Sequence, residues 1–206
     1  NTIPSMFLAG KKANELGHIV LLDPVGAGAS RLRTDTANRL MQEVRFDAVR
    51  GNISEIKTLC TGSGSTKGVD ADAVDAVTEA NLDDGVQLVK TFAQRAGCIV
   101  AVTGAIDLVS DGERCWCIRN GRAEMSRITG TGCQLSALMT AFLVANPDRK
   151  LAAAAAAVCM MGLAGEIGWA NMQPGDGNST YRNRIIDAIF NMTGDALEEG
   201  AKYELR

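Results

Sequence analysis

The first half of the chain alternates short apolar runs with helical segments, and this alternation is the feature that most constrains the fold. Strands are expected at 19–22 and 98–102, because these short runs are apolar, and a further short strand is expected at 47–49. Helices are expected at 35–44 and 83–96, where apolar residues recur with helical spacing. This order of strands and helices predicts an α/β fold, a mainly parallel sheet with helices on its faces.

The pattern changes after residue 104, where closely spaced short strands replace the alternation. Strands are expected at 106–110, 114–118 and 122–125. Asp111-Gly112 and Asn120-Gly121 stand between them, and both dipeptides are typical of hairpin turns. The parallel core should therefore be extended by an antiparallel edge. Three helices are expected after it, at 133–145, 150–170 and 178–190.

Composition and charge are those of an ordinary soluble globular protein. Hydrophobic residues make up 46% of the 206 residues and charged residues 22%, which suits a single domain over 1–206. The net charge of −3, without a basic block, argues against nucleic acid as a partner. The most apolar stretch, 151–165, is shorter than the ~20 residues that span a bilayer. It is expected to be a buried helix, so no membrane association is expected.

Six cysteines are better explained as free thiols than as disulfides. A chain of this length forms a core without covalent staples, and Cys60, Cys98 and Cys159 lie within apolar patterns. Cys115 and Cys117 form one pair two residues apart, which is a weak metal signal. Free thiols are typical of a reducing compartment, so a cytoplasmic location is expected.

The turn Thr129-Gly130-Thr131-Gly132-Cys133 leads into a helix and is the strongest local signal of a binding site. Glycines let a ligand approach the backbone, and the first N–H groups of a helix lack partners within it. The positive end of the helix dipole adds to the attraction for an anion. Residues 130–133 could thus hold the oxygens of a transferring phosphoryl group. A tight structural turn explains the same spacing about as well.

Cys133 favours the catalytic interpretation of this turn. A thiol in the first turn of a helix is stabilised as a thiolate, which can accept a proton from a substrate hydroxyl. The alternative is a small packing residue, which is how most free cysteines behave, and the other five cysteines are assigned that role. His18 is the single histidine, so acid–base chemistry should depend on carboxylates, cysteine, lysine or tyrosine.

Polar residues also follow the expected parallel strands at the point where each strand ends. Asp23 follows the first strand, Arg50 and Glu55 follow the second, and Thr103 ends the third. Ligands bind at the carboxyl ends of strands in open α/β sheets, so these residues are expected to line one cleft with Gly130–Cys133. Asp23 and Glu55 could hold Mg²⁺, and Arg50 could clamp phosphate oxygens. Singly, each is better explained as a helix cap or a surface ion pair, but four such features on one edge of one sheet are less easily explained as caps.

Two other glycine-rich segments do not complete a known nucleotide motif. Gly62–Gly68 resembles a P-loop, but Lys67 occupies the position of its second glycine and no apolar strand precedes it. Gly26 and Gly28 begin a dinucleotide fingerprint, but Arg31 stands at the position of the third glycine. Neither segment is therefore taken as a nucleotide site.

Four motifs of the chain are LDPVGAGAS at 22–30, RGNISEI at 50–56, AVTG at 101–104 and ITGTGC at 128–133. Together they resemble the hydroxyethylthiazole kinase family, which has a ribokinase-like fold. Most ribokinase-like enzymes carry Asp where this chain has Cys133, so this residue argues against pyridoxal, hydroxymethylpyrimidine and sugar kinases. The resemblance extends over nearly the whole chain.

The resemblance implies an enzyme that transfers phosphate from ATP to 4-methyl-5-(2-hydroxyethyl)thiazole in thiamine salvage. By motif position, Arg50 and Thr103 match ATP contacts. Gly130 matches a backbone contact to the substrate, and Cys133 matches the catalytic cysteine. These roles are expectations that the resemblance carries to this chain.

The resemblance also implies that Asp23 and Glu55 serve Mg²⁺, and that the protein is a homotrimer with active sites at subunit boundaries. Family members carry several dozen residues before the first helix, so the domain is expected to be N-terminally incomplete. Two other functions stay open. One is a non-catalytic nucleotide-binding or assembly domain. The other is a ribokinase-like dehydratase of hydrated nicotinamide cofactors, which would favour Asp at position 133.

Overall fold

The computed structural model describes residues 2–61 and 76–206, and the Gly62–Gly68 segment lies outside these residues. The chain divides into two compact units. Asn1–Gly104 and Leu108–Cys115 form the first unit, and Ala105–Asp107 and Trp116–Arg206 form the second. The single domain expected over 1–206 stays a prediction.

The strands form a mixed sheet in the order β1-β2-β3-β4-β5-β6. β1 pairs with β2 and β2 with β3 in parallel, whereas the β3–β4 and β5–β6 pairs are antiparallel. The expected α/β class and the antiparallel edge are confirmed, and the parallel part consists of β1 to β3. The strands are β1 (Leu21–Leu22), β2 (Ala48–Asn52), β3 (Ile99–Thr103), β4 (Asp107–Ser110), β5 (Cys115–Ile118) and β6 (Tyr203–Leu205).

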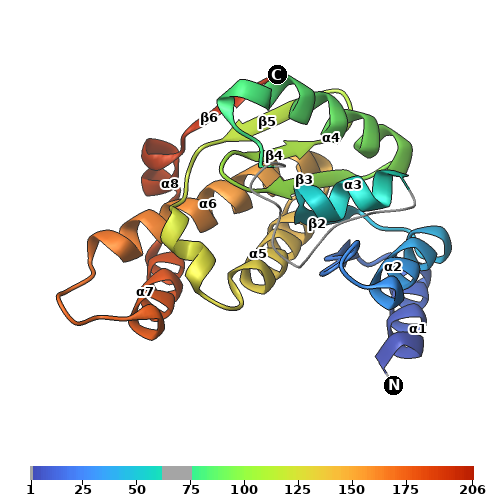
Figure 1. The fold of residues 1–206 in the computed structure, drawn as a ribbon, viewed down its shortest axis with the longest axis horizontal. Coiled ribbons are helices and arrows are strands. Elements are labelled where there is room, and N and C mark those ends of the chain that lie inside the picture. The colour runs from blue at the N-terminus through green and yellow to red at the C-terminus, as the bar shows by residue number, and fades with distance from the viewer. Residues whose placement is uncertain (1, 62–75) are drawn as a thin grey trace. The chain divides into compact units, whose positions relative to one another are not determined.

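Helices of the first unit pack against its parallel strands. α3 packs on β2, α4 packs on β3, and α1 and α2 lie side by side (Figure 1). In β2 and β3, the residues that are not fully buried are Arg50, Asn52 and Thr103, toward the carboxyl ends of the strands. The helices are α1 (Thr2–Glu15), α2 (Arg31–Glu43), α3 (Ile53–Thr61), the 3₁₀ helix η1 (Glu79–Asn81) and α4 (Leu82–Ala96).

The second unit is built around the long helix α6, which packs against α5, α7 and α8 (Figure 1). Within the described residues, Pro147–Ala170 is long and apolar enough to cross a bilayer, so the length argument made from the sequence was wrong. Its most apolar window is 78% buried, which is typical of a core helix. The helices are η2 (Ala123–Arg127), α5 (Thr131–Ala145), η3 (Pro147–Arg149), α6 (Lys150–Ala170), α7 (Asn178–Asn191) and α8 (Gly194–Gly200).

The hairpin expected at Asn120-Gly121 is wrong, because the 3₁₀ helix η2 replaces the strand expected at 122–125. The side chain of Asn120 is buried and bonds to the backbone of the segment that precedes β6. Its Nδ2 donates to the carbonyl of Gly200 at 2.9 Å, and its Oδ1 accepts the N–H of Lys202 at 2.7 Å. The end of the chain is thereby held beside β5, and β6 forms the antiparallel pair.

Glu166 ties the same region together, and its titration should affect stability. Burial acts to raise the pKa of Glu166, but hydrogen bonds from Lys202, Gly121 and Asn120 outweigh it and lower the pKa. A carboxylate with a lowered folded-state pKa stabilises the fold above its unfolded pKa, and this contribution is lost as the pH falls. We expect the free energy of unfolding to drop more steeply below about pH 4.3 in wild type than in Glu166→Gln. Urea unfolding at each pH measures this, with the exposed Glu198→Gln as control. Parallel curves for Glu166→Gln and wild type would contradict it.

Gly162 on α6 lies against the backbone of Asn120. A Cβ at Gly162 would sit 2.7 Å from the carbonyl carbon and oxygen of Asn120, where no side-chain movement can relieve the clash. We expect Gly162→Ala to lower the free energy of unfolding by about 1–3 kcal/mol. Gly194→Ala is the control, because a Cβ there has no neighbour within 4 Å among the described residues. Chemical denaturation measures the free energy of unfolding of both variants. Equal values would show that α6 can shift to accommodate the methyl group without loss of stability.

Candidate active site

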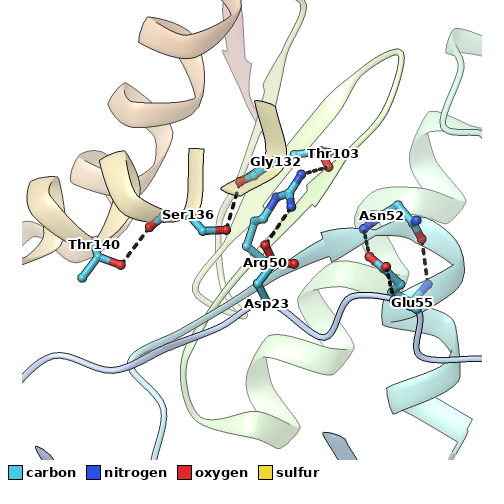
Figure 2. Close-up of polar contacts among 9 residues, drawn as sticks. Asp23, Arg50, Asn52, Glu55, Thr103, Gly132, Ser136 and Thr140 are labelled. Carbon is cyan, nitrogen blue, oxygen red and sulfur yellow. Dashed lines mark hydrogen bonds and ion pairs between the residues drawn. The ribbon is translucent and has the colours of Figure 1, made fainter. Parts of the chain in front are cut away.

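The parallel strands bring Asp23, Arg50 and Thr103 together at their carboxyl ends (Figure 2). Arg50 donates from Nη1 to Asp23 Oδ2 at 3.2 Å and from Nη2 to Thr103 Oγ1 at 3.1 Å. The register explains this contact. Arg50 pairs with Ala101, so Thr103, two residues further along β3, projects from the same face of the sheet.

The positively charged guanidinium group of Arg50 is largely shielded from water. The side chain of Arg50 is 14% exposed and that of Asp23 is 17% exposed. Arg50 Nε is buried and has no hydrogen-bond partner in the part of the chain that the structure describes. Because a buried N–H normally has an acceptor, Arg50 retains a donor that an anionic ligand can use.

Glu55 lies at the start of α3, and both of its carboxylate oxygens accept backbone N–H groups. Oε1 accepts from Gly26 at 2.8 Å. Oε2 accepts from Asn52, and the N–H of Glu55 donates to Asn52 Oδ1, each at 2.8 Å (Figure 2). Asn52 and Glu55 therefore form a reciprocal capping box. Burial raises the pKa of Glu55, these two backbone hydrogen bonds oppose the rise, and the nearby Asp23 adds to it. The Asn-x-x-Glu spacing carried the signal for this cap in the sequence.

The N–H groups of the loop after β1 donate to acceptors of the protein itself, some within the loop and some on neighbouring helices. Gly26 has a φ of +75° and Gly28 a φ of +89°, so glycine is needed for the turn geometry itself. This loop therefore differs from a phosphate-binding loop, whose N–H groups point at the ligand. The hydrogen bonds run from Val25 N to Asp23 O, Gly26 N to Glu55 Oε1, Ala27 N to Pro24 O, Gly28 N to Thr34 Oγ1 and Ala29 N to Gly26 O.

The two acidic residues differ in how well they fit a magnesium ion. Mg²⁺ is usually held by one or two carboxylates together with substrate phosphates and water. Asp23 fits such a site, because its carboxylate is partly exposed at a strand end. Glu55 does not fit, because it is 6% exposed and both oxygens already accept N–H groups. Over residues 2–61 and 76–206, no cluster of three or more His, Cys, Asp or Glu side chains is placed to hold a metal.

The expected anion-binding turn lies in the second unit, at the start of α5. Gly130 occupies the N-cap with a φ of +99°, a conformation suited to glycine, and it has no side chain to cap the helix. The first N–H groups of α5 therefore differ from those of α3, which Asn52 caps. The expectation that Gly130–Cys133 share one cleft with Arg50 stays a prediction.

Cys133 is the exposed cysteine of the chain. Cys60 and Cys98 are half-buried, and Cys115, Cys117 and Cys159 are buried. Burial raises the pKa of Cys98 and of Cys159 to about 12, with a further rise from a nearby carboxylate in each case. Those two thiols are consequently poor nucleophiles or bases at neutral pH.

Comparison with known proteins identifies relatives over almost the whole chain. The hydroxyethylthiazole kinase family model matches residues 1–195. Hydroxyethylthiazole kinase of Clostridium acetobutylicum is 52% identical over 204 residues, covering 99% of this chain and 75% of that protein. The solved structure of a hydroxyethylthiazole kinase protein from Pyrococcus horikoshii OT3 is 29% identical, with a TM-score of 0.83 over 99% of this chain and 72% of that one.

A more distant likeness concerns the fold alone. Pyridoxal kinase from Staphylococcus aureus, solved with AMP-PCP and pyridoxal, is 17% identical, with a TM-score of 0.56 over 97% of this chain and 68% of that one. The mixed sheet and this likeness place the chain in the ribokinase-like class of α/β kinase folds. Within that class, the chain belongs to the hydroxyethylthiazole kinase family. The expected fold class and family are both confirmed.

Proposed function

We propose that this chain transfers the γ-phosphoryl group of ATP to the hydroxyl of 4-methyl-5-(2-hydroxyethyl)thiazole, a reaction of thiamine salvage. The observation that carries the proposal is the start of α5, where an uncapped glycine turn precedes the exposed Cys133. An anion site and a thiol within one helical turn match the needs of phosphoryl transfer to an alcohol. Membership of the family names the alcohol.

The start of α5 supplies the groups for the chemical step. The N–H groups of residues 130–133 bind the oxygens of the transferring phosphoryl group. The substrate oxygen forms a bond to the γ-phosphorus while the bond from that phosphorus to the bridging oxygen of ADP breaks. The hydroxyl proton passes to the Cys133 thiolate, so charge and atoms balance without a further reactant.

The three residues at the strand ends of the first unit bind the nucleotide. Arg50 neutralises phosphate charge with the donor that lacks a protein partner, and Asp23 and Thr103 fix its orientation. Asp23 is the residue that would hold Mg²⁺. The ion would neutralise phosphate charge when bound with ATP.

We further propose a cytoplasmic homotrimer whose partners are ATP and a small alcohol, without nucleic acid or membrane. Family membership supports this assembly. Light scattering coupled to size-exclusion chromatography measures the oligomeric state. A monomer at micromolar concentration would contradict the trimer.

The proposed activity is tested with purified protein, Mg²⁺-ATP and the thiazole alcohol. We expect release of ADP together with a thiazole phosphate identified by mass spectrometry, and neither product without the alcohol. ATP binding without turnover would instead show a nucleotide-binding or assembly domain. Turnover of hydrated NADH, with no thiazole phosphate, would show a dehydratase.

A further inference from the structure

Glu55 joins three segments of the first unit, and we propose that it is a positioning residue for the loop that carries Asp23. Its carboxylate holds the loop in place and is not a magnesium ligand. The inference rests on the proposed function for its link to catalysis.

The carboxylate of Glu55 is the tie between this loop and the β2–α3 junction. Through Oε1 it fixes Gly26, the central residue of the loop, and through Oε2 it fixes Asn52, the last residue of β2. Its own N–H is fixed by the Asn52 side chain. Movement of Gly26 therefore breaks its hydrogen bond to a carboxylate that the capping box of α3 holds in place.

The backbone around Glu55 leaves room for this arrangement and little else. A Cβ at Gly51 would lie 3.0 Å from Glu55 Oε2 and 3.3 Å from Glu55 Cβ. The side chain of Glu55 is thus packed against the β2 backbone as well as hydrogen-bonded to it. A carboxylate that bound a metal would have to turn away from both N–H groups and leave buried donors without acceptors.

Side chains outside the loop bond to different residues of its backbone, and one of them is Arg33, which donates to the carbonyl of Val25 at 3.2 Å. Glu55 accepts the N–H of Gly26, and Thr34 on α2 accepts the N–H of Gly28 at 2.8 Å. The remaining N–H groups of Val25–Ala29 bond to carbonyls within the loop. Hydrogen bonds therefore hold this loop in place along its length. The loop begins at Asp23, the partner of Arg50.

Because Glu55 fixes the loop that carries Asp23, it affects catalysis without contact to the reacting atoms. If Gly26 is released, the Asp23 carboxylate loses its fixed position against Arg50. The phosphate-binding geometry should then deteriorate, while the intrinsic affinity for Mg²⁺ stays with Asp23 and the nucleotide. A positioning residue and a metal ligand can therefore be distinguished experimentally.

The first test uses Glu55→Gln and hydrogen exchange in protein without metal or nucleotide. Glutamine keeps the length of the side chain but has one acceptor oxygen, so one of the two N–H groups loses its partner. We expect exchange at the Gly26 or Asn52 amide to rise about tenfold. Glu43→Gln, an exposed carboxylate paired with Lys11, is the control and should leave both amides unchanged. Unchanged exchange in Glu55→Gln would overturn the proposal.

The second test compares turnover with magnesium dependence. We expect Glu55→Gln to lower kcat while the Mg²⁺ concentration for half-maximal rate changes less than about twofold, because a lost metal ligand costs about 10–100-fold. Asp23→Asn should instead raise that concentration about tenfold or more. A large magnesium shift in Glu55→Gln with wild-type amide exchange would identify Glu55 as a metal ligand.

A variant at a residue other than Asp23 and Glu55 keeps the proposal testable if Glu55→Gln does not fold. Thr34→Val removes the acceptor for Gly28 and has no metal-binding chemistry. We expect faster exchange at the Gly28 amide, a lower kcat and unchanged magnesium dependence. Wild-type kcat together with faster exchange would show that loop position does not matter. Because exchange needs no substrate, failure of the proposed phosphorylation leaves that part of the test intact.

Discussion

Replacing Cys133 with serine is expected to lower kcat by about 10²–10⁴-fold, the contribution of a general base. An alcohol is a far weaker base than a thiolate at neutral pH, so the substrate hydroxyl would lose its proton acceptor. ATP affinity should change little, because the strand-end group of Arg50 and Thr103 is untouched. A steady-state assay with Mg²⁺-ATP and the thiazole alcohol measures kcat, and calorimetry measures ATP binding.

Aspartate at the same position tests whether proton transfer is the role of Cys133. A carboxylate is ionised at pH 7 and can accept the proton, so Cys133→Asp should retain or increase turnover. Cys60→Ser is the matched control, since Cys60 is half-buried and has no assigned role. If Cys133→Ser turns over like wild type, Cys133 is a packing residue. If Cys133→Asp is folded but inactive, Cys133 is not the proton acceptor, and the N–H groups of the turn must supply the rate enhancement.

The parallel part of the fold could be predicted because burial on both faces leaves a clear trace in the sequence. The runs at 19–22 and 98–102 are continuously apolar, 47–49 has two apolar residues after Asp47, and the structure places a strand in each region. Since parallel strands end at the same edge, Arg50, Asp23 and Thr103 could be expected near one another, whereas the hydrogen bonds between them are seen only in the structure.

The antiparallel edge could be predicted only in part, because a single side chain decides its second half. Asn120-Gly121 has the composition of a hairpin turn. Its outcome depends on Gly200 and Lys202, about 80 residues away, whose backbones bond to the Asn120 side chain. A contact at such distance leaves no local pattern, so neither β6 nor the loss of the strand at 122–125 could be foreseen.

The role of Glu55 shows a second limit of sequence reasoning. A carboxylate at the end of a strand and the start of a helix suits both a metal site and a capping box. Asn52 three residues earlier favours the cap, but only the hydrogen bonds show that both oxygens of Glu55 are occupied. Residue type and spacing thus locate the site. Whether a carboxylate in it caps a helix or is available to a metal is decided by the hydrogen bonds that its oxygens accept.

Arg50→Lys is expected to lower kcat/KM for ATP by about 10²–10³-fold, as for loss of one preorganised donor. The guanidinium donates to Asp23 and Thr103 at once and keeps Nε for a ligand, whereas an ammonium on a flexible stem cannot present the same planar fork. Arg39→Lys, whose side chain is exposed and pairs with Glu43, is the control. Wild-type ATP affinity and turnover in Arg50→Lys would remove Arg50 from the nucleotide site.

A double-mutant cycle with Thr103 shows how Arg50 acts. If Thr103 serves to orient Arg50, Thr103→Val should cost about 1 kcal/mol of transition-state stabilisation, the net value of one hydrogen bond, in a chain that retains Arg50. In the Arg50→Lys background the same change should cost almost nothing, because the bond is already lost. If Thr103 instead contacts the nucleotide itself, the two losses should add. Values of kcat/KM for ATP in the four proteins separate these cases, and additivity would assign Thr103 a nucleotide contact of its own.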